Sequence, residues 1–326
     1  MPQRELGVAI GKFFPPHRGH KHLIDVASRQ VERLVVIVCS KPADTIPGEL
    51  RASWLREIHP DVEVIRIDDV YDPEDSAVWA ANTTRWLGRA PDVAFTSEDY
   101  GPRWARLMGA AHVMVDRERS RVPCRGVEIR ARPLDNLGFV EPCVRAFLVP
   151  RIVILGAEST GTTTLAKALG DRYRTRWVPE YGREYCEMLD DLFTHKWRTE
   201  EFIAIAREQN RREDHAARTA EPLLICDTDS FATGIWHERY VGQRSVDVER
   251  LSGSRRYAHT FVTDVDIPFA QDGLRDGESI RTSMHDLFIT RLREAGRPFT
   301  VVRGSREERV EAAVAAIDDI VAALTF

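Results

Sequence analysis

The sequence LGVAIGKFFPPHRGH at residues 6–20 decides the fold of the N-terminal half. Its apolar run at 6–10 ends in Gly11, a loop rich in proline and histidine follows, and a helical pattern begins near His20. The next apolar run, LVVIVC at 34–39, is rich in β-branched residues, which is typical of a parallel strand buried on both faces. This order predicts a strand, loop, helix and strand, the repeating unit of an open α/β sheet.

The same alternation continues along the N-terminal half. The pattern predicts further strands at 62–67, 93–96 and 111–115 and further helices at 53–58, 77–87 and 101–108. Strands that alternate with helices form a parallel sheet with helices on both faces. We therefore predict an α/β doubly wound parallel sheet.

A second strand, loop and helix begin with RIVILGAESTGTTTL at 151–165. Later apolar runs predict strands at 223–226, 261–263 and 300–302, and an alanine-rich segment at 307–324 predicts a closing amphipathic helix. The chain of 326 residues is long enough for two domains of about 150 residues. We predict two doubly wound α/β domains, at 1–147 and 148–326.

Composition narrows the class of protein. The chain is 43% hydrophobic and 30% charged, with a formal net charge of −5, so it lacks the basic balance expected of a duplex-binding protein. Five scattered cysteines form no C-x-x-C pair, which argues against a disulfide framework or a zinc site. No apolar stretch is long enough to span a membrane, and no signal peptide is evident. These features favour a cytoplasmic protein with neither a membrane nor DNA as partner.

Two histidines, His17 and His20, stand three residues apart where the first loop enters a helix. A helix N-terminus attracts anions, and imidazole N–H groups can donate to phosphate oxygens. The alternative interpretation is a pair of exposed turn residues.

The second loop has Gly156 and Gly161 at the spacing of a P-loop, and Thr163 stands where a hydroxyl binds Mg²⁺. Thr162 occupies the position of the usual lysine, and only five of the 46 basic residues are lysines. Lys167 lies more than a helical turn further on, so an arginine from a lid is the better candidate for the missing charge. A simple glycine turn remains the alternative.

Polar residues near the later strands complete the second candidate site. Asp227 follows a strand, where open α/β sheets place ligands, and it could orient a hydroxyl or help hold Mg²⁺; the alternative is a helix N-cap. The segment PEYGREY at 179–185 carries a carboxylate and a guanidinium near a turn, although it could be a solvated helix start. A polar loop at 264–276, followed by Arg281, is typical of a mobile lid.

GKFFPPHRGH at 11–20 resembles the G-x-F-x-P-x-H-x-G-H signature of the nucleotidyltransferase superfamily. The resemblance implies in-line adenylyl or cytidylyl transfer with the histidines on the triphosphate, usually with Mg²⁺. The best match to the superfamily's second signature is CRGVEIR at 124–130. It keeps Arg130 as a phosphate ligand but has Arg125 and Val127 where hydroxyls are usual.

The order of an H-x-G-H domain and a P-loop domain is similar to the NadR family, as are PEYGREY, LLICDTD and TDVDIPFAQDGLR in the second half. The resemblance implies a nicotinamide mononucleotide adenylyltransferase joined to a ribosylnicotinamide kinase, both using ATP. Some family members carry an N-terminal helix-turn-helix domain. Because the first strand begins near Leu6, we expect no such domain and no DNA binding here.

The motifs and the resemblance together give a set of expected site residues. The expected catalytic residues are His17, His20, Arg130 and Asp227. The expected ATP-binding residues are Gly11, Phe13, Gly19, Gly156, Glu158, Ser159, Thr160, Gly161, Thr162, Thr163, Thr164 and Arg275. The expected substrate-binding residues are Glu180, Arg183 and Trp236, and the expected Mg²⁺ ligands are Thr163 and Asp227.

The sequence is also compatible with two other functions. Thr162 is compatible with a nucleotide sensor whose kinase half binds ligand without turnover. The H-x-G-H signature also serves transfer to other phosphorylated substrates. The expected partners are small molecules, and the sequence is compatible with a homo-oligomer without predicting one.

Overall fold

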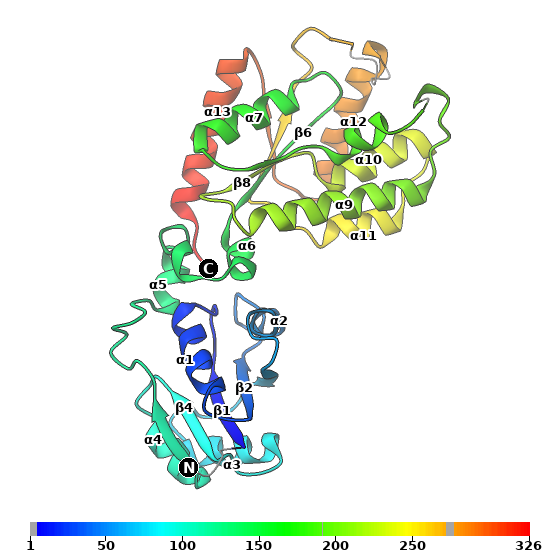
Figure 1. Cartoon of the computed structure of the whole chain (residues 1–326). Coiled ribbons are helices and arrows are strands. Elements are labelled where there is room, and N and C mark those ends of the chain that lie inside the picture. The colour runs from blue at the N-terminus through cyan, green and yellow to red at the C-terminus, as the bar shows by residue number, and fades with distance from the viewer. Residues whose placement is uncertain (1–4, 191, 272–276) are drawn as a thin grey trace. The chain divides into compact units, whose positions relative to one another are not determined.

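The computed structural model describes residues 5–190, 192–271 and 277–326. The chain divides into two compact units, which we call unit 1 (residues 1–145 with 324–326) and unit 2 (residues 146–323). Each unit contains one sheet of five parallel strands with helices around it (Figure 1). The predicted fold class is confirmed.

Unit 1 has the strand order β3-β2-β1-β4-β5. The chain first adds β2 and β3 on one side of β1 and then adds β4 and β5 on the other side, so the strand order reverses beside β1. Its strands are β1 (Leu6–Gly11), β2 (Arg33–Ser40), β3 (Glu63–Asp68), β4 (Val93–Thr96) and β5 (Ala111–Met114). Its helices are α1 (Arg18–Ser28), α2 (Gly48–Ile58), α3 (Ser76–Leu87), α4 (Gly101–Met108) and α5 (Gly126–Ala131), followed by a 3₁₀ helix at Leu134–Phe139. The division between the units falls within α6 (Pro142–Leu148).

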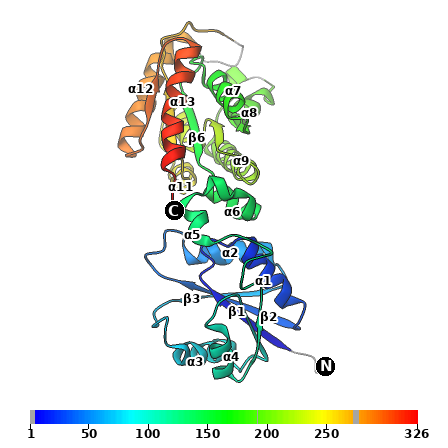
Figure 2. The same cartoon turned by 90° about the vertical axis from the view of Figure 1, so that its left-hand side faces the viewer.

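The alternation of side chains along β1 and β2 explains why helices cover both faces of this sheet. Val36 and Val38 pack with α1 and α2, whereas Val35 and Ile37 pack with α3 and α4. Figure 2 shows these helix pairs on opposite sides of the strands. All four side chains are almost fully buried, as the continuous apolar run predicts for a central parallel strand.

Unit 2 has the strand order β10-β9-β6-β8-β7. Its strands are β6 (Arg151–Gly156), β7 (Trp177–Val178), β8 (Leu224–Asp227), β9 (His259–Thr263) and β10 (Thr300–Val302). Its helices are α7 (Thr162–Tyr173), α8 (Tyr181–Glu187), α9 (Thr199–Ala217), α10 (Ser230–Val241), α11 (Val246–Gly253), α12 (Arg281–Glu294) and α13 (Arg306–Ala323), with 3₁₀ turns at Leu192–Thr194 and Glu278–Ile280.

The neighbours of β6 place the second loop at a ligand-binding edge. β6 lies between β8 and β9, and all three strands point the same way, so their carboxyl ends meet beside the start of α7. Open α/β sheets bind ligands at this edge. No helix in the described ranges is long and apolar enough to cross a membrane.

Candidate functional sites

The first site is built around the start of α1. His17 is the N-cap residue, and its Nδ1 accepts hydrogen bonds from the backbone N–H groups of Gly19 (3.1 Å) and His20 (3.4 Å). The backbone N–H of His17 in turn donates to Nδ1 of His20 at 3.3 Å. The two rings stack with their centroids 3.7 Å apart. The histidines therefore form a reciprocal cap that fixes both rings at the helix N-terminus.

The same contacts set the charge and the tautomer of the two imidazoles. Burial, helped by the positive charge of Arg119, lowers the pKa of His17 to about 4. Burial also lowers the pKa of His20 well below its usual value, with smaller effects from His17 and Arg119. Both rings are consequently neutral at pH 7, and because each Nδ1 accepts, each Nε2 carries the proton. The site offers two uncharged N–H donors.

A pocket surrounds these rings and includes every residue predicted for the first site. Its predicted members are Gly11, Phe13, His17, Gly19, His20 and Arg130. A Cβ at Gly19 would lie 3.0 Å from the His17 ring, so this position favours glycine. Arg130, on α5, lies with its guanidinium 4.4 Å from the centre of the Phe14 ring and donates to the Phe14 carbonyl. The loop at 11–20 and the segment at 124–130 therefore meet, as the two-signature resemblance implies.

Sequence reasoning missed three cations and a thiol in this pocket. Lys12, Arg119 and Arg125 line it together with Arg130. Lys12 lies inside the motif, and the arginines belong to a span whose high arginine content was the available signal. The Sγ of Cys124 lies 3.3 Å from Nδ1 of His17. The pocket is suited to a polyanion.

Arg51, on α2, holds the first loop from behind and was also missed. Its guanidinium is fully buried and donates to the backbone carbonyls of Ile46 (3.0 Å), Cys39 (3.1 Å) and Lys12. It also forms an ion pair with Asp44. A charge buried in this way is satisfied by the chain itself, so Arg51 fixes the loop's position.

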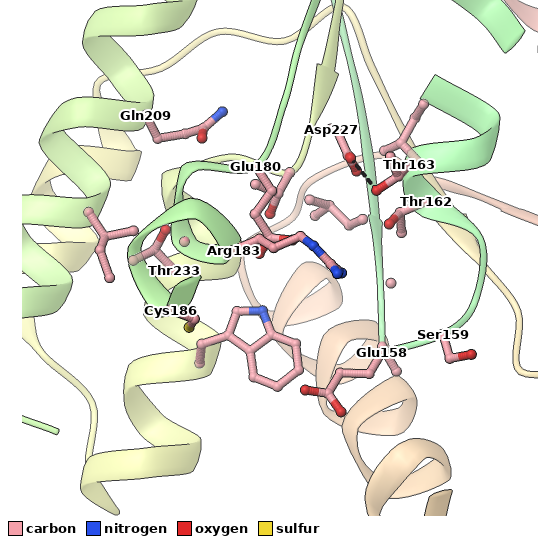
Figure 3. A pocket seen from close by; sticks show the side chains of 18 of the residues that line it. Glu158, Ser159, Thr162, Thr163, Glu180, Arg183, Cys186, Gln209, Asp227 and Thr233 are labelled. Atoms are coloured by element: carbon pink, nitrogen blue, oxygen red, sulfur yellow. Dashed lines mark hydrogen bonds between the residues drawn. The ribbon is translucent and has the colours of Figure 1, made fainter. Parts of the chain in front are cut away.

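The second site is the P-loop between β6 and α7 (Figure 3). Gly161 has a φ of +86°, a left-handed conformation that favours glycine. A Cβ at Gly156 would lie 2.2 Å from Oγ1 of Thr263, so a larger residue would push β6 and β9 apart. Thr160 lies beneath the loop, where its Oγ1 donates to the Ala157 carbonyl at 2.6 Å. Of the predicted loop residues, Thr160 is therefore the one whose hydroxyl is turned away from the pocket.

The remaining predicted loop residues line one pocket with all three predicted substrate residues and Asp227. Those that line it are Gly156, Glu158, Ser159, Gly161, Thr162, Thr163, Thr164, Glu180, Arg183, Asp227 and Trp236. Arg275 lies outside the described residues. Residues that sequence reasoning missed include Cys186, Gln209 and Thr233, which come from three different helices.

Asp227 ends β8 and lies against the first turn of α7. Its Oδ2 accepts a hydrogen bond of 2.6 Å from Oγ1 of Thr163. Its Oδ1 is buried and has no hydrogen-bond partner in the described part of the chain. Burial raises the pKa of this carboxyl above its usual range. A hydroxyl beside an unpartnered carboxylate oxygen fits a Mg²⁺ ion, which takes few protein ligands and completes its shell with phosphates and water.

Asp229, two residues later, has a structural position. Its side chain accepts from the backbone N–H of Ala232 at 2.9 Å and caps α10. Its other oxygen forms an ion pair of 2.6 Å with Arg297. The helix-cap interpretation thus applies to Asp229, while Asp227 faces the pocket.

Glu180 and Arg183 lie at the start of α8, opposite the loop. Burial, with further effects from the carboxylates of Asp227 and Glu158, raises the pKa of Glu180 to about 8. Glu180 is therefore mostly protonated at pH 7. Trp236, on α10, stacks with Tyr240 at 6.1 Å between ring centres. With Trp197 and Phe202 these rings give the pocket an aromatic wall.

Arg281, expected on a lid helix, lies beneath the loop. It is the first residue of α12 and donates to the carbonyls of Ile267 (2.7 Å) and Ser159 (3.0 Å). Arg309, on α13, similarly donates to the Thr160 carbonyl. Both side chains are buried, so these arginines support the loop from its protein side.

Known domain models match both halves. The cytidylyltransferase-like model matches residues 8–132, and an AAA domain model matches residues 151–309. No described group of three or more histidine, cysteine, aspartate or glutamate residues could hold a metal ion. Fold and sites thus define a nucleotidyltransferase-like domain followed by a P-loop domain.

Similar proteins share both domains. Two relatives, each called trifunctional NAD biosynthesis/regulator protein NadR, are 28% identical and cover 92% of this chain and 79% of their own length; they come from Escherichia coli K12 and Salmonella typhimurium LT2. A crystal structure of a NadR protein in complex with NR covers 98% of this chain and 96% of its own, with a TM-score of 0.78 at 18% identity. A NadR complex with NAD and AMP-PNP gives a TM-score of 0.74 at 19% identity and the same coverage. The chain is therefore similar to NadR proteins over both of its domains.

Proposed function

We propose that this protein makes NAD from ribosylnicotinamide in two ATP-dependent reactions. Unit 2 phosphorylates the 5′-hydroxyl of ribosylnicotinamide, and unit 1 transfers an adenylyl group from a second ATP to the resulting mononucleotide. The similarity to NadR proteins over both domains supports this proposal. The main observation behind this proposal is that each unit has a loop suited to binding phosphate, and that polar side chains line the pocket beside each loop.

In unit 1 the chain supplies positioning and charge, and it forms no covalent intermediate. The Nε2–H groups of His17 and His20 donate to phosphate oxygens of ATP, while Lys12, Arg119 and Arg130 balance the charge of the polyphosphate. The phosphate of the mononucleotide attacks the α-phosphorus, and pyrophosphate leaves. Because the rings are neutral donors, their contribution does not depend on protonation near pH 7.

In unit 2 the backbone N–H groups of the P-loop bind the phosphates of ATP. Thr163 and Asp227 would hold Mg²⁺, which supplies positive charge to the phosphate oxygens when it is bound. The 5′-hydroxyl of the riboside, which Asp227 orients, attacks the γ-phosphorus and loses its proton, and ADP leaves. The nicotinamide ring of the riboside is cationic, so the aromatic wall with Trp236 is a suitable surface for it.

Thr162 favours a second candidate, a nucleotide sensor that binds ligands in unit 2 without phosphorylating them. Separate assays of the half-reactions distinguish the two functions. Purified protein with Mg-ATP and ribosylnicotinamide should release ADP, and with nicotinamide mononucleotide it should release pyrophosphate and form NAD. Formation of NAD from the mononucleotide without ADP from the riboside would favour the sensor. Absence of both products, or faster transfer to phosphopantetheine, would overturn the proposal.

A further inference from the structure

The P-loop of unit 2 lacks a charge that this kind of loop ordinarily has. Thr162 opens α7 at the position where a P-loop lysine reaches the β- and γ-phosphates. A triphosphate bound here without a nearby cation would place several negative charges beside the carboxylates of Glu158 and Asp227. A basic residue from another element of unit 2 is needed to take the place of the lysine.

Three basic residues near the loop do not face the pocket. Arg281 and Arg309 donate to the loop's carbonyls from its protein side. Lys167, on α7, lies with its Nζ 5.4 Å from the centre of the Trp177 ring and does not line the pocket, although its charge, like that of Arg183, lowers the pKa of Asp227. These cations stabilise the loop and the helix, but they do not replace the lysine.

Arg183 is the one lysine or arginine among the described pocket-lining residues. It lies in the first turn of α8, and its side chain is 44% exposed, so a ligand can reach it. Its Nε lies 3.4 Å from Glu187 on the same helix, a loose and exposed pairing. Figure 3 shows its guanidinium pointing from α8 toward the loop, on the side where Thr162 and Thr163 stand.

The electrostatics of the neighbouring groups agree with this position. Burial raises the pKa values of Glu180, Asp227 and Cys186 overall, and the charge of Arg183 lowers each of the three by a smaller amount. Glu180 is the N-cap residue of α8 and Cys186 lies on this helix, but Asp227 ends β8, beside the P-loop. The charge of Arg183 therefore acts on a group on the P-loop side of the pocket. A guanidinium also presents a planar pair of N–H donors that fits two phosphate oxygens in a bidentate geometry, whereas a lysine ammonium acts as a point charge.

We propose that Arg183 binds the terminal phosphates of ATP and supplies the charge that the P-loop lacks at Thr162. This proposal rests on the proposed kinase function and assigns Arg183 to the nucleotide, in place of the riboside contact expected from the sequence. Arg183 and residue 162 then form an exchangeable pair: a cation is needed at one of the two positions.

The test measures nucleotide and riboside binding separately by calorimetry. Arg183→Met should weaken binding of AMP-PNP with Mg²⁺ by about 10- to 100-fold, the range for one charge-assisted hydrogen-bond partner. Ribosylnicotinamide binding should stay within about threefold, because the aromatic wall is unchanged. Arg183→Lys should retain part of the nucleotide affinity. Arg207→Met is the matched control, since Arg207 is exposed on α9 and does not line the pocket.

The double variant Thr162→Lys with Arg183→Met should bind AMP-PNP more tightly than Arg183→Met alone. The proposal is overturned if Arg183→Met keeps wild-type nucleotide affinity, if it loses riboside and nucleotide affinity equally, or if the added lysine restores nothing in a protein with wild-type thermal stability. A wild-type protein that binds AMP-PNP but does not phosphorylate the riboside would contradict the kinase function while leaving the nucleotide measurement valid.

Discussion

Thr163 Oγ1 donates a hydrogen bond of 2.6 Å to Asp227 Oδ2, which joins the first turn of α7 to the end of β8. The contact leaves Asp227 Oδ1 buried without a partner in the described residues. A buried oxygen without a partner costs folding free energy. The presence of such an oxygen in Asp227 therefore indicates that a bound ligand supplies the missing partner.

Asp227→Asn should lower the rate of riboside phosphorylation by roughly 10²-fold or more, because the variant loses the negative charge that holds Mg²⁺ and orients the hydroxyl. Its stability should be unchanged or raised, since a buried charge is removed. ADP release and thermal unfolding measure the two effects. Adenylyl transfer to nicotinamide mononucleotide, which occurs in unit 1, is the internal control. If this variant phosphorylated the riboside at the wild-type rate, Asp227 would have no role in the reaction.

Asp229 should behave in the opposite way. Asp229→Asn keeps an acceptor for the α10 cap but breaks the buried pair with Arg297, so the free energy of unfolding of unit 2 should fall by about 3 kcal/mol. Urea denaturation measures this change. Asp247→Asn, which breaks an exposed pair with Arg250, should change stability by less than about 1 kcal/mol. Equal effects of the two substitutions would contradict the structural role of Asp229.

His17→Asn separates the capping role of His17 from its chemical role. Asparagine is a good N-cap residue, so α1 should stay intact. Loss of the Nε2–H donor should nevertheless slow NAD formation from the mononucleotide by roughly 10²-fold, the cost of removing one preorganised donor to a developing charge. Riboside phosphorylation should be unaffected. If both reactions slowed equally in a folded variant, the assignment of one reaction to each unit would be wrong.

Glu180 predicts a pH dependence for the kinase reaction. With a pKa of about 8, the carboxyl is protonated at pH 6.5 and largely ionised at pH 9. The ionised form attracts the cationic riboside, so kcat/KM for the riboside should rise by about tenfold across this range and level off above the pKa. Glu180→Gln should flatten the profile. A rise that persists in Glu180→Gln would assign the titration to another group.

Much of both sites could be predicted from short, local patterns. The glycines at 156 and 161 and the histidines at 17 and 20 act within one strand-loop-helix unit, where spacing along the chain determines geometry. The five strands of unit 1 and four of the five strands of unit 2 could be predicted from apolar runs for the same reason, whereas β7, which has only two residues, was not predicted.

Contacts between distant segments could not be predicted in this way. Nothing near Arg51 in the sequence indicates that it is buried against the first loop, and α9, which contributes Gln209 to the second pocket, is highly charged along most of its length. The two aspartates at 227 and 229 look alike in sequence, and contacts with distant residues distinguish them: Asp227 pairs with Thr163, and Asp229 pairs with Arg297, on a loop after α12.

The most direct test of the two-site account follows ribosylnicotinamide through the whole chain. With Mg-ATP, the wild-type protein should convert it to NAD and release one ADP and one pyrophosphate per molecule. His17→Asn should stop at nicotinamide mononucleotide, and Asp227→Asn should form NAD only when the mononucleotide is supplied. Failure of the wild-type protein to make NAD from either compound, or the same block in both variants, would contradict the account.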